Sequence, residues 1–322
     1  MDPGRASSCR IVIRGGGEMG SGVAWRLRRC GFDVVITEVE HPLAVRRWVS
    51  FSEAIYEGSI TVEGTTAHRV ELPESTRIDE LCRKGDIPIL ICPDPSEISA
   101  LRSDVVVDAI LAKRNTGTVQ GMAKLVIGLG PGFVAGEDVD CVIETNRGSN
   151  LGRCIWSGSA EANTGLPGEV GGETVKRVLR APVAGIVHQA RDIGDILRAG
   201  EVVAYVDGSE VRSQLDGIVR GMLRDQTPVD QGVKIGDIDP RADIELCRRI
   251  SDKALAIGGG VLEAVMTCKD GNYVPALSNC HPEERSDEGS AVRPRARRAL
   301  TADPSSLQFR PVWGRRKARS SG

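Results

Sequence analysis

A short apolar run at residues 11–13 leads directly into glycines at positions 15, 17 and 20, which are spaced as G-x-G-x-x-G. In this motif the first glycine makes a tight turn, the second lets a pyrophosphate approach the backbone, and the third lets a helix pack closely on the strand. The apolar residues that follow recur at helical spacing. The sequence therefore predicts a strand, a phosphate-binding loop and a helix whose free N–H groups face an anion.

Two charged residues flank this loop. Glu38 ends a second apolar run, about 20 residues beyond the motif, where a carboxylate can accept hydrogen bonds from ribose hydroxyls. Arg14 ends the first strand and would place a guanidinium beside the anion. The candidate nucleotide site therefore comprises these two residues and the loop glycines Gly15, Gly16, Gly17 and Gly20. The alternative interpretation is a glycine-rich turn that binds no ligand.

Further apolar runs predict the body of a first domain. Continuous Val, Ile and Leu runs are typical of parallel strands covered on both faces. They occur at residues 33–37, 87–92, 104–111, 124–128 and 140–144. Between them, residues 42–58 have near-helical spacing, residues 59–71 alternate like a hairpin and residues 75–84 are typical of a short helix. We expect an α/β fold with a Rossmann-like parallel-sheet domain over residues 9–160.

A polar segment broken by glycines follows the strand expected at residues 140–144. Its two arginines, Arg147 and Arg153, could clamp a phosphate or a carboxylate through paired N–H groups. A plain surface loop has the same composition, so both interpretations stay open. Residues 161–177 are rich in Gly and Pro and are expected to form a linker.

Residues 178–240 repeat themselves at an offset of 32, so that Gly185-Ile186-Val187 matches Gly217-Ile218-Val219. Short strands with turn glycines at equal intervals predict a small symmetric β-sandwich. The pattern resembles the biotinyl/lipoyl carrier fold. A carrier presents a lysine for its cofactor at the turn between the halves, whereas this chain has Asp-Gly-Ser-Glu at residues 207–210. We therefore expect no biotin or lipoate, and a module for docking or for homo-oligomerisation.

The C-terminal residues divide into two parts. Residues 241–277 are expected to be helical, but three glycines at 258–260 interrupt the pattern. Each glycine costs about 1 kcal/mol relative to alanine inside a helix, which favours either a close backbone approach or two separate helices. Residues 278–322 are rich in Arg, Ser, Pro and Glu, which predicts a disordered tail. They also resemble translated bacterial repeat DNA, so this tail could lie outside the native protein.

The overall composition argues against several classes of function. A net charge of −2 and an aromatic content of 3% argue against a nucleic-acid partner. No apolar stretch reaches the roughly 18 residues of a membrane helix, and the N-terminus lacks a signal peptide, so we expect a cytoplasmic protein.

Nine cysteines without C-x-x-C spacing and four histidines predict no metal site. Cys92 ends a strand where a ligand crevice is expected, although a reduced core cysteine is the simpler interpretation.

Taken together, the chain resembles the YqeB-like family, which is linked to selenium-dependent molybdenum hydroxylases. The resemblance is carried by residues 14–22, 49–58, 108–113, 128–136, 142–148, 151–153 and 250–265. It implies an accessory protein for cofactor or selenium insertion, with the hydroxylase and other maturation proteins as partners. It also implies a molybdopterin dinucleotide as the ligand, whose pyrophosphate the glycine loop and Arg14 could hold. Family members often carry His where this chain has Ser149, which puts chemistry at that position in doubt.

The alternative function is an NAD(P)-dependent oxidoreductase, for which the glycine motif and Glu38 would serve equally well. From the sequence, no histidine–carboxylate or lysine constellation can be placed beside the crevice. Lys113 is the only candidate proton donor, and a solvated lysine is the simpler interpretation. No catalytic residue is therefore assigned.

Overall fold

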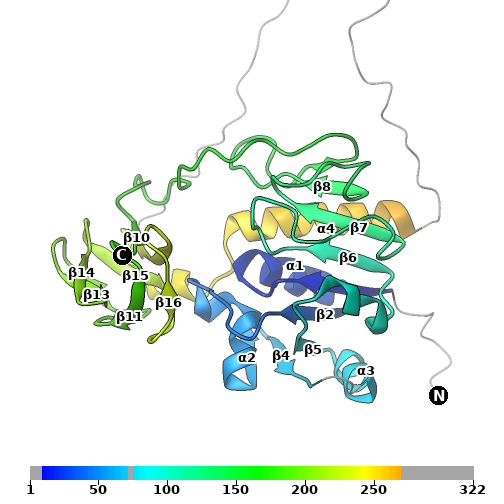
Figure 1. Cartoon of the computed structure of the whole chain (residues 1–322), viewed down its shortest axis with the longest axis horizontal. Helices are drawn as coiled ribbons and strands as arrows, with labels where there is room; N and C mark the ends of the chain where they lie inside the picture. The colour runs from blue at the N-terminus through cyan, green and yellow to red at the C-terminus, as the bar shows by residue number, and fades with distance from the viewer. Residues whose placement is uncertain (1–8, 72–74, 270–322) are drawn as a thin grey trace, which may run out of the picture. The chain divides into compact units, whose positions relative to one another are not determined.

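The computed structural model describes residues 9–71 and 75–269. Its largest element is a nine-stranded sheet with the strand order β3-β4-β5-β2-β1-β6-β7-β8-β9 (Figure 1). The strands are β1 (Arg10–Arg14), β2 (Asp33–Glu38), β3 (Ser59–Val62), β4 (Thr65–Arg69), β5 (Ile87–Ile91), β6 (Val105–Asp108), β7 (Leu125–Leu129), β8 (Cys141–Ile143) and β9 (Cys154–Ile155). In the spatial order of the sheet, the strands from β4 to β8, which include β1 and β2, are all parallel. The two edge strands, β3 and β9, run antiparallel to their neighbours.

Helices cover both faces of the central strands. Ile11 and Ile13 of β1 belong to the core formed with α1 (Glu18–Arg29) and α4 (Asp252–Lys269). Val12, which points to the opposite face, belongs to a core that includes α3 (Ser75–Lys84). Because alternate side chains are buried on opposite faces, the strand is apolar at each of its central positions, 11–13.

The helix α4 packs along α1, although the two are far apart in the sequence. It is one continuous helix, so the sequence alternative of two separate helices is not observed. A Cβ at Gly260 would lie 2.1 Å from the carbonyl oxygen of Gly152, and one at Gly258 would lie 3.1 Å from that of Gly22. These two glycines therefore allow the close backbone approach that the pattern favoured.

The second set of strands forms two four-stranded sheets, ordered β10-β17-β15-β12 and β14-β13-β11-β16. The strands are β10 (Val178–Arg180), β11 (Gly185–Gln189), β12 (Ile196–Leu197), β13 (Val202–Val206), β14 (Ser209–Arg212), β15 (Gly217–Met222), β16 (Pro228–Val229) and β17 (Lys234–Asp239). Two residues from the first part of the chain, Val45 and Trp48, pack against the core of these sheets. The N–H of Met222 donates to the carbonyl oxygen of Val45 at 2.8 Å.

The expectation of a Rossmann-like parallel-sheet domain followed by a biotinyl/lipoyl-like β-sandwich is wrong. The first sheet is mixed, with antiparallel edges at β3 and β9. The connections β5–β6 and β6–β7, which the structure describes throughout, contain the 3-10 helix Pro95–Leu101 and irregular backbone but no α-helix. The second set of strands completes its core with residues from near position 45. Apolar periodicity indicates which segments are buried, but it does not indicate strand direction or which distant segment covers them.

One local prediction also fails. Residues 42–58 contain two 3-10 turns, Arg47–Val49 and Phe51–Glu53, and the short helix α2 (Ala54–Glu57), rather than one helix.

The domain limits drawn from the sequence stay predictions. The tail expected at residues 278–322 lies outside the described residues. Within the described part of the chain, no helix combines the length and the apolar character needed to span a membrane.

Candidate functional site

The glycine loop between β1 and α1 is tight at its ends and open in its middle. Gly15 has a φ of 94°, a left-handed conformation that residues with a Cβ rarely adopt. A Cβ at Gly20 would lie 2.0 Å from the carbonyl oxygen of Gly15. Gly17 is the N-cap of α1, and a Cβ there would meet nothing within 4 Å. The loop therefore has room for a side chain or a ligand group at Gly17, but not at Gly15 or Gly20.

A cavity of about 560 Å³ lies over this loop, and we call it the loop cavity. It is lined by the loop, by the first turn of α1 and by the residues that end or follow β1, β2, β5 and β6. The first backbone N–H groups of a helix have no acceptor within the helix, and the helix dipole is positive at this end. An anionic group in the loop cavity would be stabilised by both effects.

Arg14 lines the loop cavity, but its charge is already balanced. The residue is 4% exposed, and its Nη1 donates to Oδ2 of Asp108 at 2.9 Å. Thr118 contacts the same nitrogen, and its hydroxyl donates to the Asp108 carboxylate at 2.6 Å. Arg14 and Asp108 are register partners on β1 and β6. They form a buried ion pair, so the guanidinium expected beside a phosphate brings no net positive charge.

Glu38 bonds directly to the glycine loop. Its Oε1 accepts from the backbone N–H of Gly16 at 2.7 Å, and its Oε2 accepts from the N–H of Val39 at 2.9 Å. Burial raises the pKa of this carboxyl, although the two hydrogen bonds act in the opposite direction. The carboxylate thus occupies one of the loop donors that a phosphate would use.

Ser52 completes the wall of the loop cavity, and sequence reasoning missed it. Its N–H donates to the carbonyl oxygen of Gly16 at 2.9 Å. Its Oγ is buried and has no hydrogen-bond partner among the described residues. No local signal identifies Ser52, because the tertiary structure brings this segment to the loop. Asp108 was also missed, although an acidic residue that ends a buried run is a signal that could have found it.

The two arginines predicted to clamp an anion do not meet at the glycine loop. Arg147 donates through both Nη atoms to the carboxylate of Asp252 and lines a second cavity, of about 360 Å³. Arg153 is exposed, and its Nε donates to the carbonyl oxygen of Ser149 at 3.3 Å. Glu18 and Met19 line both cavities, so the first turn of α1 lies between them.

Cys92 lines the loop cavity, as the strand pattern predicted. Burial raises the pKa of its thiol to about 11, and its Sγ lies 3.6 Å from Oε2 of Glu97. The thiol therefore stays protonated at neutral pH, which disfavours nucleophilic chemistry. Lys113, the proton donor considered for an oxidoreductase, lines the second cavity instead.

No family model matches the chain. The chain is 48% identical, over 256 residues, to the uncharacterized protein YqeB of Escherichia coli (strain K12). The match covers 80% of this chain and 47% of that protein, so the chain spans about half the length of this curated relative.

Two solved structures resemble this chain weakly. An aspartoacylase family protein from Mesorhizobium loti is 15% identical with a TM-score of 0.22, covering 72% of this chain and 85% of that chain. A succinylglutamate desuccinylase/aspartoacylase from Rhodobacter sphaeroides is 14% identical with a TM-score of 0.21, covering 72% and 85%. At these scores the likenesses carry no argument about the chemistry of this chain.

Proposed function

This chain is YqeB-like over 256 of its residues, and from that premise we propose that it binds a phosphate-containing dinucleotide in the loop cavity. The proposed role is that of an accessory protein that helps to insert the cofactor or selenium into a selenium-dependent molybdenum hydroxylase. The proposed ligand is a molybdopterin dinucleotide. The observation that carries the proposal is the open loop position at Gly17 beneath a cavity of about 560 Å³.

The residues around the loop cavity fit such a ligand. The free N–H groups at the start of α1 can hold a pyrophosphate, and Gly17 leaves room for it. Ser52 lines the loop cavity, and its buried Oγ, which has no hydrogen-bond partner among the described residues, could bond a polar atom of the ligand after the side chain turns toward the cavity. The cavity volume lies within the range of about 300–1,000 Å³ that is typical of small-molecule sites.

Glu38 has two roles available to it in this site. When a phosphate takes the Gly16 N–H, the carboxylate has to move away or become protonated. Once displaced, it can accept hydrogen bonds from a ribose hydroxyl of the same ligand. Glu38 would therefore compete with the phosphate before the ligand binds and hold the sugar afterwards.

A substitution at Gly17 tests ligand binding at the loop. Its φ of −66° and ψ of −177° suit any residue, and Asp is a favoured N-cap. Gly17→Asp should therefore fold normally while its carboxylate takes the N–H groups meant for phosphate. We expect dinucleotide affinity, measured by calorimetry, to fall at least about tenfold, since charged hydrogen bonds contribute about 1.5–3 kcal/mol. Gly17→Ser is the matched control, because it caps the helix without adding charge and should lose less affinity.

A ligand titration and a genetic experiment test the rest of the proposal. NADH is titrated in parallel, because Glu38 also suits the ribose of NAD(P); tight binding with turnover would favour an oxidoreductase. In a strain that lacks this gene, the molybdenum hydroxylase is purified and assayed for activity, molybdenum and releasable selenium. Loss of selenium alone indicates selenium insertion, and loss of both indicates cofactor delivery. A fully active and fully loaded enzyme contradicts the maturation role.

A further inference from the structure

The second cavity, of about 360 Å³, is unusually rich in cations, and we call it the basic cleft. Its walls come from the start of α1, from loops at residues 145–147 and 161–168, from β10, β15 and β17, and from the start of α4. Seven lysine and arginine side chains line it, against the three carboxylates of Glu18, Glu161 and Asp237. This imbalance is local, because the whole chain has a net charge of −2.

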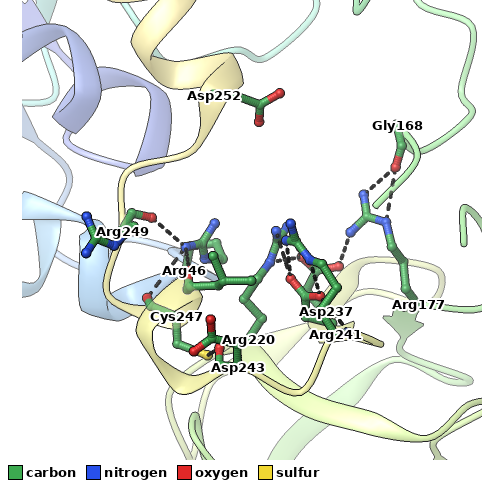
Figure 2. A network of polar contacts seen from close by, with 12 residues as sticks. Arg46, Gly168, Arg177, Arg220, Asp237, Arg241, Asp243, Cys247, Arg249 and Asp252 are labelled. Atoms are coloured by element: carbon green, nitrogen blue, oxygen red, sulfur yellow. Dashed lines mark hydrogen bonds and ion pairs between the residues drawn. The ribbon is translucent and has the colours of Figure 1, made fainter. Parts of the chain in front are cut away.

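One wall of the basic cleft is a group of cations around a buried carboxylate. Figure 2 shows Arg177 and Arg220 directed toward Asp237 from two sides. Nη2 of Arg220 lies 2.7 Å from Oδ2 of Asp237, and Nζ of Lys234 lies 3.7 Å from Oδ1. Burial acts to raise the pKa of Asp237, but the three cations lower it below its ordinary value. Asp237 therefore stays ionised, and one carboxylate faces three positive charges.

Residues behind the walls do not remove this excess. Four outer residues pair with the lining residues or with each other: Arg46, Asp239, Arg241 and Asp252. They add two charges of each sign, and the buried carboxylate of Glu144, which acts on Lys253, adds one negative charge. The basic cleft therefore keeps an excess of positive charge.

Two lysines of the basic cleft, Lys113 and Lys253, make no direct ion pair with a carboxylate among the described residues. Burial lowers the pKa of the Lys253 ammonium, and Arg147 lowers it further. Three carboxylates act on this pKa in the opposite direction without restoring it, those of Glu18, Glu144 and Asp252. Partial burial of an ammonium that no carboxylate contacts directly is costly, and a bound anion would reduce that cost.

We propose that the basic cleft binds a small anion with two or more phosphate groups, such as pyrophosphate or the polyphosphate part of a nucleotide. A single phosphate group carries about −1.5 to −2 charges at neutral pH, so one group leaves part of the excess charge unbalanced and two groups match it. Guanidinium forks on the walls suit phosphate oxygens. The inference goes beyond the proposed function and does not rest on it, since only Glu18 and Met19 belong to both cavities.

The test is calorimetric titration of the full chain with inorganic pyrophosphate at constant ionic strength. It is done in the Gly17→Asp variant, in which we expect the loop cavity to bind phosphate at least about tenfold more weakly. We expect one pyrophosphate to bind per chain. Lys253→Met and Lys113→Met should each weaken binding about tenfold, because each removes a charged hydrogen bond. Lys176→Met is the matched control, since Lys176 is exposed and outside the cleft, and it should bind like its parent.

The outcomes separate the two sites. Binding to Gly17→Asp that weakens with either cleft lysine, at an unchanged melting temperature, supports the basic cleft even if the dinucleotide proposal fails. Binding to the natural chain that Gly17→Asp abolishes assigns the anion to the loop and overturns the inference. No binding to either form, or binding that neither lysine substitution affects, overturns it as well.

Discussion

The Glu38 carboxylate accepts a hydrogen bond from the backbone N–H of Gly16 at 2.7 Å, so the glycine loop already holds an anion from its own chain. A phosphate that approaches the same N–H meets a negative charge. Because burial raises the pKa of Glu38, this carboxyl is protonated more readily than an exposed one. Glu38, the candidate ribose-binding residue at the end of β2, therefore also competes with a phosphate for the Gly16 N–H.

Glu38→Gln should bind sulfate at the loop more tightly than the natural chain, by roughly tenfold, because a like charge is removed from the site. In the natural chain the sulfate affinity should rise as the pH falls toward the pKa of Glu38, and the substitution should abolish that rise. Sulfate is the probe because it does not titrate in this range. The exposed neighbour substitution Glu40→Gln is the control. An affinity that is independent of both pH and Glu38 would contradict the competition.

Gly260→Ala should destabilise the protein by about 1–3 kcal/mol, a typical cost of overpacking. The new Cβ would lie 2.1 Å from the carbonyl oxygen of Gly152, and backbone cannot yield as a side chain can. Gly259→Ala should instead stabilise by up to about 1 kcal/mol, since its Cβ meets nothing within 4 Å and alanine favours helix. Urea unfolding of the two variants measures the difference. Equal stabilities would mean that α4 does not pack closely on the loop at residue 152.

Arg14→Met should lower the free energy of unfolding by about 3–5 kcal/mol, because it leaves the buried Asp108 carboxylate without its partner. Adding Asp108→Asn should restore much of that loss, since the uncompensated charge is then gone. Denaturant unfolding of both single variants and the double variant measures the coupling between the two residues. Additive losses would show that the ion pair does not act as a unit.

The pH at which acid unfolds the protein should depend on Arg241. Burial acts to raise the pKa of Asp239, but the hydrogen bonds from Arg241 and the charge of Arg220 lower it below its ordinary value. A carboxyl with a lowered folded-state pKa contributes stability above its unfolded pKa and loses that contribution as the pH falls through the folded value. Arg241→Gln should therefore shift acid unfolding to higher pH, as followed by circular dichroism. Arg212→Gln, which breaks an exposed pair with Glu210, should shift it much less.

The local sequence determined which segments are buried and how the chain turns between them. The apolar runs before Gly15 and Glu38 became β1 and β2, and the hairpin and helix expected at residues 59–71 and 75–84 are present as β3, β4 and α3. These features depend on neighbours a few residues away, so periodicity and glycine positions suffice to predict them.

Only the tertiary structure decided how these segments combine. The partner of Arg14 comes from β6, Ser52 reaches the loop from a 3-10 turn, and α4 covers α1 from the far end of the described chain. The excess positive charge of the basic cleft arises from segments as distant as Lys113 and Lys253. Such contacts depend on strand direction and on long-range packing, which side-chain periodicity along one segment does not encode.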